Sequence, residues 1–389
     1  VCESFMTGRI DRHNRATHGL RPMNIVESST GYERWLADRI PLLATDLKKK
    51  HELMAQDEFS FFRATFYRWA QVWPMVCDEA ASAPVALAIG DLHVENFGTW
   101  RDAEGRLVWG INDFDEACNM PYTCDLVRLA TSALLAIAAG HLKLSAGDAS
   151  QSILDGYTEA LHRGGEPTVL SGKHSALRTM AVERLKDPKA FWDKLESIAT
   201  LRSKIPGRAA KALHRAIPEG ASEVRVLHRV SGLGSLGRRR FVAIASWRGA
   251  YVAREAKELA ESAWYWAHPP KGKAAKRMTA VHYEEVLRRA IRCPDPFVEL
   301  RDPWIVRRLA PDCSRIELSS LPSKHDANRL LRAMGWETAN VHLGSISAKK
   351  LQADLKARPK DWLKSNAEAM LRETKKDWMT WRRAQKVSK

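Results

Sequence analysis

The chain has 389 residues, of which 45% are hydrophobic and 28% are charged. This composition excludes a disordered or low-complexity chain, because it provides enough apolar mass to offset the entropy lost on ordering. The six cysteines lack the paired spacing of a disulfide framework or a zinc site, so we expect reduced thiols in a cytoplasmic protein. The longest apolar run, at 130–140, is shorter than the roughly 20 residues that span a bilayer, so we expect no membrane span.

The net charge is strongly positive, at +16, and indicates an anionic partner such as nucleic acid, anionic lipid or a phosphorylated small molecule. The excess is uneven along the chain. The stretch 346–389 holds 13 Lys and Arg against 5 Asp and Glu. Half of the net charge therefore belongs to a basic C-terminal tail and says little about the chemistry of the core.

The predicted elements change type twice in chain order. The first 80 residues have the apolar spacing of helices, and helical patterns return from about 124 to 217 and again from 325 onward. Strand-length segments are 84–90, 106–113 after a turn at 101–105, three alternating runs between 223 and 257, and 303–310. Residues 91–100 are expected to form a loop. These patterns predict an α+β fold with a small antiparallel sheet.

The densest chemistry lies between residues 90 and 125. Asp91, Asn96, Asp113 and Asp115 lie on segments that flank one tight hairpin, and strand pairing would bring the first two beside Asp113. Carboxylates with an amide oxygen suit Mg²⁺, which prefers oxygen ligands and often shares them with substrate phosphates, so Asn96, Asp113 and Asp115 are the candidate metal ligands. A carboxylate that does not bind the metal could serve as a base toward a substrate hydroxyl. The alternative is a set of solvated turn acids, which the joint spacing makes less favourable.

These motifs resemble the catalytic segment of kinase-like phosphotransferases, closest to the aminoglycoside and choline kinase branch. The matching residues are Gly90, Asp91, His93, Asn96, Ile111, Asp113, Phe114 and Asp115. The resemblance implies that Asp91 is the catalytic base and that Asn96 and Asp113 are Mg²⁺ ligands. It also implies that Asp125 braces the catalytic loop. Ile89 departs from the pattern, since a His often stands there.

His93 lies between the proposed base and Asn96. It is a candidate for contact with substrate or for a hydrogen-bonded brace of its own loop. Arg63, in an aromatic-rich segment, could reach an anionic substrate or could pair with an acidic side chain. His342, in a helical pattern, is a candidate to help hold the catalytic loop.

A glycine motif at Gly232, Gly234 and Gly237 precedes an alternating, strand-like segment. A dinucleotide-binding loop would lead into a helix instead. The arrangement therefore favours a kinase-type flap over nucleotide phosphates, with Ser235 near the phosphates, over a plain glycine-rich hairpin. On the third strand Arg254 or Lys257 would supply a cation for the phosphates, and strand alternation favours Arg254.

The glycine motif follows the acidic motif, whereas ordinary kinases have the opposite order. The two resemblances together imply a circularly permuted, two-lobe protein-kinase-like fold. Residues 1–217 would form a helical catalytic lobe, 218–320 a nucleotide-covering sheet lobe, and 321–389 a helical return with the basic tail. Residues 55–345 resemble a bacterial family called domain of unknown function 2252, for which no activity is settled.

Three hypotheses follow for function. The first is a phosphotransferase that uses ATP and Mg²⁺ to modify a hydroxyl or amine of a small-molecule acceptor. The second is a catalytically weak, nucleotide-binding regulator, suggested by Ile89 and by an arginine at 254. The third is a nucleic-acid-binding protein that uses the basic tail. The same metal and carboxylate geometry would also serve transfer of a nucleotidyl group. The sequence does not identify the acceptor.

Overall fold

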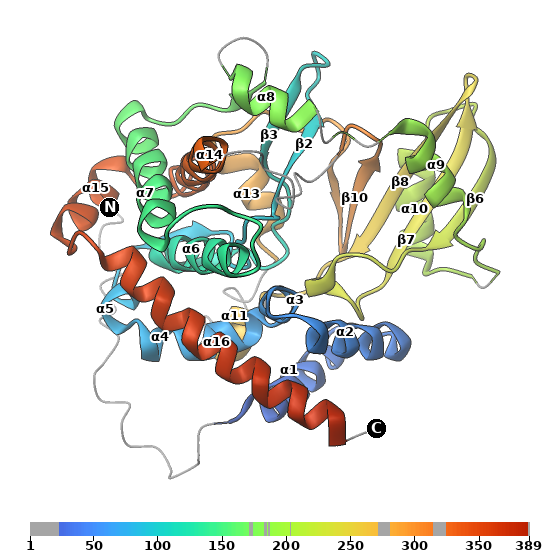
Figure 1. The fold of residues 1–389 in the computed structure, drawn as a ribbon. Coiled ribbons are helices and arrows are strands. Elements are labelled where there is room, and N and C mark those ends of the chain that lie inside the picture. Colours follow the sequence, from blue (N-terminus) through green and yellow to red (C-terminus); the bar gives the residue numbers. More distant parts are fainter. Residues whose placement is uncertain are drawn as a thin grey trace, which may run out of the picture.

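The structure is a computed structural model and describes residues 23–170, 174–182, 185, 187–202, 204–270, 281–313 and 324–387. Helices surround three small antiparallel sheets, so the predicted α+β class is confirmed (Figure 1). None of the helices in the described ranges is long and apolar enough to cross a membrane.

Five helices open the described chain, as predicted for the first 80 residues. They are α1 (Ile25–Ala37), α2 (Ala44–Gln56), α3 (Glu58–Ala64), α4 (Phe66–Val76) and α5 (Asp78–Ala81). A capping box begins α1, because the Asn24 side chain accepts from the N–H of Glu27 while the Glu27 side chain accepts from the N–H of Asn24. The aromatic-rich α4 buries Trp69 and Trp73 in the main core. Pro74 lies inside α4 instead of ending it.

Two small sheets hold residues 90–116, which we call the acidic segment. They contain β1 (Val85–Ala88) paired with β4 (Cys118–Pro121), and β3 (Leu107–Ile111) paired with both β2 (Phe97–Arg101) and β5 (Thr168–Val169). The tight hairpin is thus formed by β2 and β3. The prediction that residues 91–100 are all loop is wrong at its end, because Phe97 and Trp100 are buried and pair in register with β3.

Helices again follow the acidic segment. They are α6 (Thr123–Ala138), α7 (Ala146–Arg163), α8 (Ser175–Val182), α9 (Pro188–Glu196) and α10 (Gly207–Ala216). Helix α6 contains most of the longest apolar run and is buried on nearly every side. It positions Asp125 and Arg128, both fully buried, next to the loop after β1.

The third sheet of the fold is antiparallel and has five strands. Its strands are β6 (Ser222–His228), β7 (Arg240–Trp247), β8 (Ala250–Glu258), β9 (Glu299–Arg301) and β10 (Trp304–Leu309), in the order β6-β7-β8-β10-β9. The short helix η1 (Leu233–Ser235) lies between β6 and β7, and α11 (Ala263–Ala267) and α13 (Tyr283–Arg289) lie between β8 and β9. Helix α10 packs on one face through Leu213, and α9 packs on the opposite face through Phe191. The three alternating runs predicted between 223 and 257 are confirmed as the adjacent strands β6, β7 and β8.

Three helices complete the chain: α14 (Lys324–His342), α15 (Ala348–Ala357) and α16 (Trp362–Val387). Helix α14 packs closely along α7 at two glycines. A Cβ on Gly156 would lie 1.8 Å from the carbonyl oxygen of Arg332, and one on Gly335 would lie 2.0 Å from that of Ile153. The backbones therefore approach at a distance that no side chain would permit.

The basic C-terminal stretch is part of the core instead of a separable tail. Helix α16 crosses the molecule in front of α4 and α6 (Figure 1). Leu363, Ala367, Met370 and Trp381 are buried in the main core. The basic residues of α16 lie on the solvent side of this amphipathic helix.

Candidate functional site

One pocket, which we call the central pocket, brings together residues that are far apart in the sequence. It has about 600 Å³ of empty volume, its open mouth included. Eight residues from the predicted catalytic, metal and nucleotide-binding sets line it: Asp91, His93, Asn96, Asp113, Asp115, Gly232, Gly234 and Ser235. The acidic segment and the glycine loop therefore face the same cavity, although they belong to different sheets.

A buried carboxylate holds the loop that carries Asp91. Asp125, at the start of α6, accepts hydrogen bonds from the backbone N–H groups of Ile89 at 2.7 Å and Gly90 at 2.8 Å. The Nε2 atom of His342 lies 3.0 Å from the same carboxylate. Both side chains are fully buried, so this contact links α6, α14 and the loop. The geometry agrees with the bracing roles expected for Asp125 and His342.

The carboxylate of Asp91 is bound on one side and faces the central pocket on the other. Fully buried Arg128 donates to its Oδ1 from Nε at 3.0 Å and from Nη2 at 2.5 Å. The Nδ2 of Asn96 donates to the backbone oxygen of Asp91 at 2.6 Å. A Cβ on Gly234 would lie 3.2 Å from Oδ2. Burial raises the pKa of Asp91 above its usual range, and the pairing with Arg128 opposes that shift.

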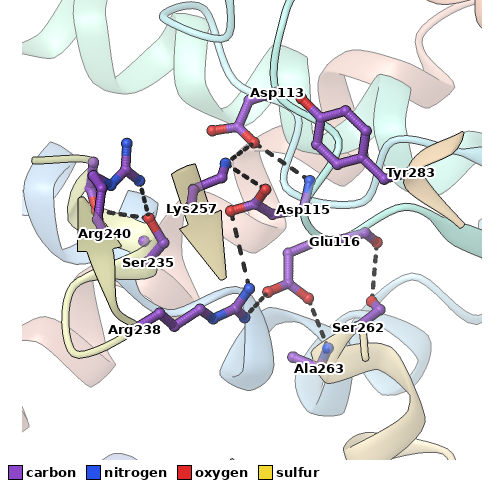
Figure 2. Close-up of polar contacts among 12 residues, drawn as sticks. Asp113, Asp115, Glu116, Ser235, Arg238, Arg240, Lys257, Ser262, Ala263 and Tyr283 are labelled. Atoms are coloured by element: carbon purple, nitrogen blue, oxygen red, sulfur yellow. Dashed lines mark hydrogen bonds and ion pairs between the residues drawn. The ribbon is translucent and has the colours of Figure 1, made fainter. Parts of the chain in front are cut away.

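Two acids after β3 contact a lysine of the five-stranded sheet (Figure 2). The Nζ of Lys257, on β8, lies 2.5 Å from Oδ1 of Asp115 and 3.2 Å from Oδ1 of Asp113. The lysine side chain is only 1% exposed, so water screens these pairs little. Burial raises the pKa of Asp115, and the charge of Asp113 adds to that effect while Lys257 opposes it.

The structure places Arg254 away from the central pocket. Its Nε donates to the carbonyl oxygen of Ala216 at 2.9 Å, and its guanidinium lies 4.9 Å from the ring centroid of Phe297. Strand alternation explains this position, because Arg254 and Ala256 share the face that α10 covers while Lys257 is on the opposite face. Lys257, the alternative left open by the sequence, is therefore the β8 cation that reaches the acidic segment.

A second ion pair joins the acidic segment to the end of the glycine loop (Figure 2). The Nη2 of Arg238 lies 2.9 Å from Oε1 of Glu116, and its Nη1 lies 3.9 Å from Oδ2 of Asp115. Glu116 also accepts from the N–H of Ala263 at 2.6 Å, and its backbone oxygen accepts from the hydroxyl of Ser262 at 2.9 Å. Burial raises the pKa of Glu116, and Arg238 opposes the shift. This buried network fixes the sheet to the acidic segment.

The glycine loop, residues 232–237, joins two antiparallel strands, as the sequence predicted. Gly232 and Gly237 have φ angles of +78° and +98°, which favour glycine. Ser235, in the short helix, lines the pocket with the first half of the loop. Gly237 does not line it, because it packs against α2, where its Cβ would lie 2.5 Å from Leu47.

Three arginines surround one buried carboxylate beneath the glycine loop. Arg229, Arg240 and Arg307 contact Glu255 at 2.6, 3.0 and 2.8 Å. Burial acts to raise the pKa of Glu255, but the three guanidinium groups hold it well below its usual range. Arg240 also donates to the hydroxyl of Ser235 at 2.7 Å. The ion cluster therefore anchors the loop to the sheet.

His93 and Arg63 both line the central pocket and both bind within the protein. His93 lines the pocket, is 3% exposed, and accepts from the N–H of Glu95 at 3.2 Å through its Nδ1. Arg63 lines the pocket and its Nη1 lies 2.5 Å from Oε2 of Glu95. Each side chain thus borders the cavity while it also binds within the protein.

The oxygen donors suited to Mg²⁺ are Asn96 and Asp113. The N–H of Asn112 donates to the carbonyl oxygen of Asn96 at 3.1 Å. This hydrogen bond extends the pairing of β2 and β3 and brings the segments that carry Asn96 and Asp113 side by side. Because Nδ2 of Asn96 is committed to a backbone oxygen, its amide oxygen is the group suited to a cation. Asp115, the third predicted ligand, contacts Lys257. Among the described residues, no group of three or more His, Cys, Asp and Glu has metal-binding geometry. Water and substrate phosphates usually complete such a Mg²⁺ shell.

Three polar side chains from the N-terminal helices line the central pocket and were not singled out from the sequence: Tyr32, Lys50 and Tyr67. The spacing of the buried residues of α2 could have indicated Lys50. Asp46, Lys50 and Met54 recur every four residues and share the buried side of the helix. Its neighbours Lys48 and Lys49 are exposed, whereas Lys50 faces the interior.

Residues 42–204 match the model of a family described as "Uncharacterized protein conserved in bacteria (DUF2252)". The match contains the acidic segment and α2, and it ends before the glycine loop. It supports the resemblance to this bacterial family. No curated protein and no solved structure matches the chain.

Proposed function

We propose that this protein is an ATP- and Mg²⁺-dependent phosphotransferase that acts on a hydroxyl or amine of a small-molecule acceptor. The observation that carries the proposal is the central pocket, in which a candidate base, oxygen donors and a glycine loop border one cavity. Phosphoryl transfer depends mainly on positioning and on electrostatic stabilisation of the phosphates, and these groups can supply both.

In this proposal Asp91 is the base toward the acceptor. Arg128 fixes one carboxylate oxygen, so the other is directed to the pocket beside Gly234. Asn96 and Asp113 would hold Mg²⁺, which when bound neutralises part of the triphosphate charge. Lys257, on β8 of the five-stranded sheet, is the cation that we expect to contact the phosphates of the ATP donor.

The proposal includes a kinase-like fold in permuted order. In protein kinases a glycine-rich loop covers the phosphates and the lysine lies on the third strand. Here the glycine loop joins β6 and β7, the first two strands of the five-stranded sheet, and Lys257 lies on β8, the third. The acidic segment precedes this sheet in the chain, and α14 returns to it through His342.

The first test is calorimetric titration of ATP with and without Mg²⁺, followed by ATP turnover with a panel of hydroxyl and amine acceptors. We expect Mg²⁺-dependent binding and acceptor-dependent release of ADP. Binding without turnover across the panel would favour the nucleotide-binding regulator. Absence of any nucleotide binding would contradict both.

Asp91→Asn tests the base without a change of side-chain size. We expect turnover to fall by about 10²–10⁴-fold, while ATP affinity is retained. Because burial raises the pKa of Asp91, turnover of the natural protein should fall with acid at a pH above the usual value of about 4. Asp155→Asn, on the surface of α7, is the matched control and should change neither quantity.

A further inference from the structure

Lys50 is a buried cation of the central pocket that the roles above do not use. It lies on α2 and is 3% exposed. Its Nζ donates to the carbonyl oxygen of Gly234 at 3.2 Å and lies 5.7 Å from the ring centroid of Tyr67. An ammonium group has three N–H donors, so the single hydrogen bond leaves capacity for a ligand.

Lys50 differs in its pairing from the other cations that line the pocket or contact its acids. Arg63 and Arg238 line the pocket and pair with Glu95 and Glu116. Arg128 and Lys257 do not line it, but they pair with its acids Asp91 and Asp115. Across the part of the chain that the structure describes, Lys50 has no such carboxylate. Burial lowers the pKa of Lys50 to about 8, and the charge of Arg238 adds to this effect. The more distant charges of Glu33, Glu116 and Asp91 oppose it.

An ammonium group that is buried without a counter-charge is costly unless a bound anion supplies one. The position of Lys50 indicates where that anion would lie. Its Nζ contacts the carbonyl oxygen of Gly234, and the Oδ2 of Asp91 faces the Cα of the same glycine. The cation and the candidate base therefore border the same point of the glycine loop.

We propose that Lys50 binds the phosphoryl group that is transferred, beside Asp91 and under the tip of the glycine loop. This inference rests on the proposed function. In the transfer, the bond between the γ-phosphorus and the β–γ bridging oxygen breaks, and its electron pair stays on ADP. A bond forms between phosphorus and the acceptor oxygen or nitrogen, whose proton passes to Asp91. Lys50 exchanges no proton and stabilises the charge on the phosphoryl oxygens.

The test compares two complexes of the full chain, ADP with Mg²⁺ and ADP with Mg²⁺ and aluminium fluoride, which imitates the phosphoryl group in transfer. Lys50→Met should leave ADP affinity unchanged and weaken binding of the aluminium fluoride complex by about 100-fold, the usual effect of losing one electrostatic donor. Lys50→Arg, which keeps the positive charge, should lose less affinity for the aluminium fluoride complex than Lys50→Met. Lys49→Met, one residue away and exposed, is the matched control and should bind both complexes normally.

Three results would overturn the inference. Equal weakening of both complexes by Lys50→Met would assign the lysine to the resting diphosphate, and no weakening of either would remove it from the site. The third result is a natural protein that binds no nucleotide but binds tripolyphosphate, with that binding lost in Lys50→Met. It would show that Lys50 forms an anion site, but it would contradict both the proposed function and the transferred phosphoryl group as the anion bound there. Melting temperatures of the variants, measured without ligand, separate these results from loss of folding.

Discussion

The ammonium group of Lys257 lies 2.5 Å from a carboxylate oxygen of Asp115, and this buried contact joins the five-stranded sheet to the acidic segment (Figure 2). Arg238 and Glu116 make a second buried ion pair between the same two parts. The glycine loop extends from this sheet, so the two pairs also set the position of the loop over the central pocket.

The Lys257–Asp115 pair should show energetic coupling. In a double-mutant cycle with Lys257→Met and Asp115→Asn, we expect each single variant to lower the free energy of unfolding. The double variant should lose less than the sum, with a coupling of about 0.5–3 kcal/mol. Urea unfolding measures the four free energies. Additive losses would show that the contact does not stabilise the fold.

Asp113→Ala should remove the Mg²⁺ dependence of nucleotide affinity. We expect binding at least about tenfold weaker in the presence of Mg²⁺, as for loss of one metal-coordinating interaction of about 1.4 kcal/mol or more. The melting temperature without ligand should change little, because Asp115 still pairs with Lys257. Glu104→Gln, exposed at the turn of the same hairpin, is the control. A collapse in stability would instead identify Asp113 as an architectural acid.

Stability should depend on pH through Glu337. Burial raises the pKa of this α14 carboxyl to about 7, where it accepts from the hydroxyl of Thr168 at 2.6 Å. A raised carboxyl pKa means that the folded state binds the proton more tightly, so this stabilisation is complete below the usual pKa of about 4.3 and is lost as pH rises through 7. Glu337→Gln should remove this dependence and make the protein more stable than the natural one at pH 8, by up to about 3 kcal/mol. Urea unfolding of both proteins at pH 5 and pH 8 gives the change in the free energy of unfolding between the two pH values. An equal change in the two proteins would contradict the assignment.

Removal of α16 should unfold the protein. The helix contributes Leu363, Met370 and Trp381 to the main core, and the loss of these contacts should cost more than about 5 kcal/mol. Circular dichroism during heating is expected to show no cooperative transition for a chain ending at residue 361. A folded truncated chain would restore the separable tail that the sequence suggested.

A test of nucleic-acid binding therefore needs substitutions that leave α16 in place. Arg382, Arg383 and Lys386 are exposed on this helix. If nucleic acid binds there, reversal of the three charges to glutamate should weaken binding and lower the salt dependence of affinity by roughly three counterions. An unchanged salt slope would exclude this surface from nucleic-acid binding.

The sequence predicted which acidic residues lie together, because their signal is local. Asp91, Asn96 and Asp113 lie on loops next to short apolar strands, and hairpin pairing brings such loops together. The glycine loop was likewise recognised from the strand-like segments on either side. The α+β class followed from these periodicities.

Other features depend on tertiary packing and could not be predicted from local patterns. Arg254 was preferred over Lys257 because alternation shows which residues share a face of a strand, but not which face a helix covers. Lys50 was hidden in a run of three lysines. The basic residues of α16 concealed an amphipathic helix whose apolar side completes the core.

The most direct test of the account is a crystal structure of the protein with a non-hydrolysable ATP analogue and Mg²⁺. We predict the triphosphate in the central pocket, with Mg²⁺ bound by Asn96 and Asp113, Lys257 on the donor phosphates and Gly234 over the γ-phosphate. A nucleotide bound outside this pocket, or phosphates that contact only one of the acidic segment and the glycine loop, would contradict the account.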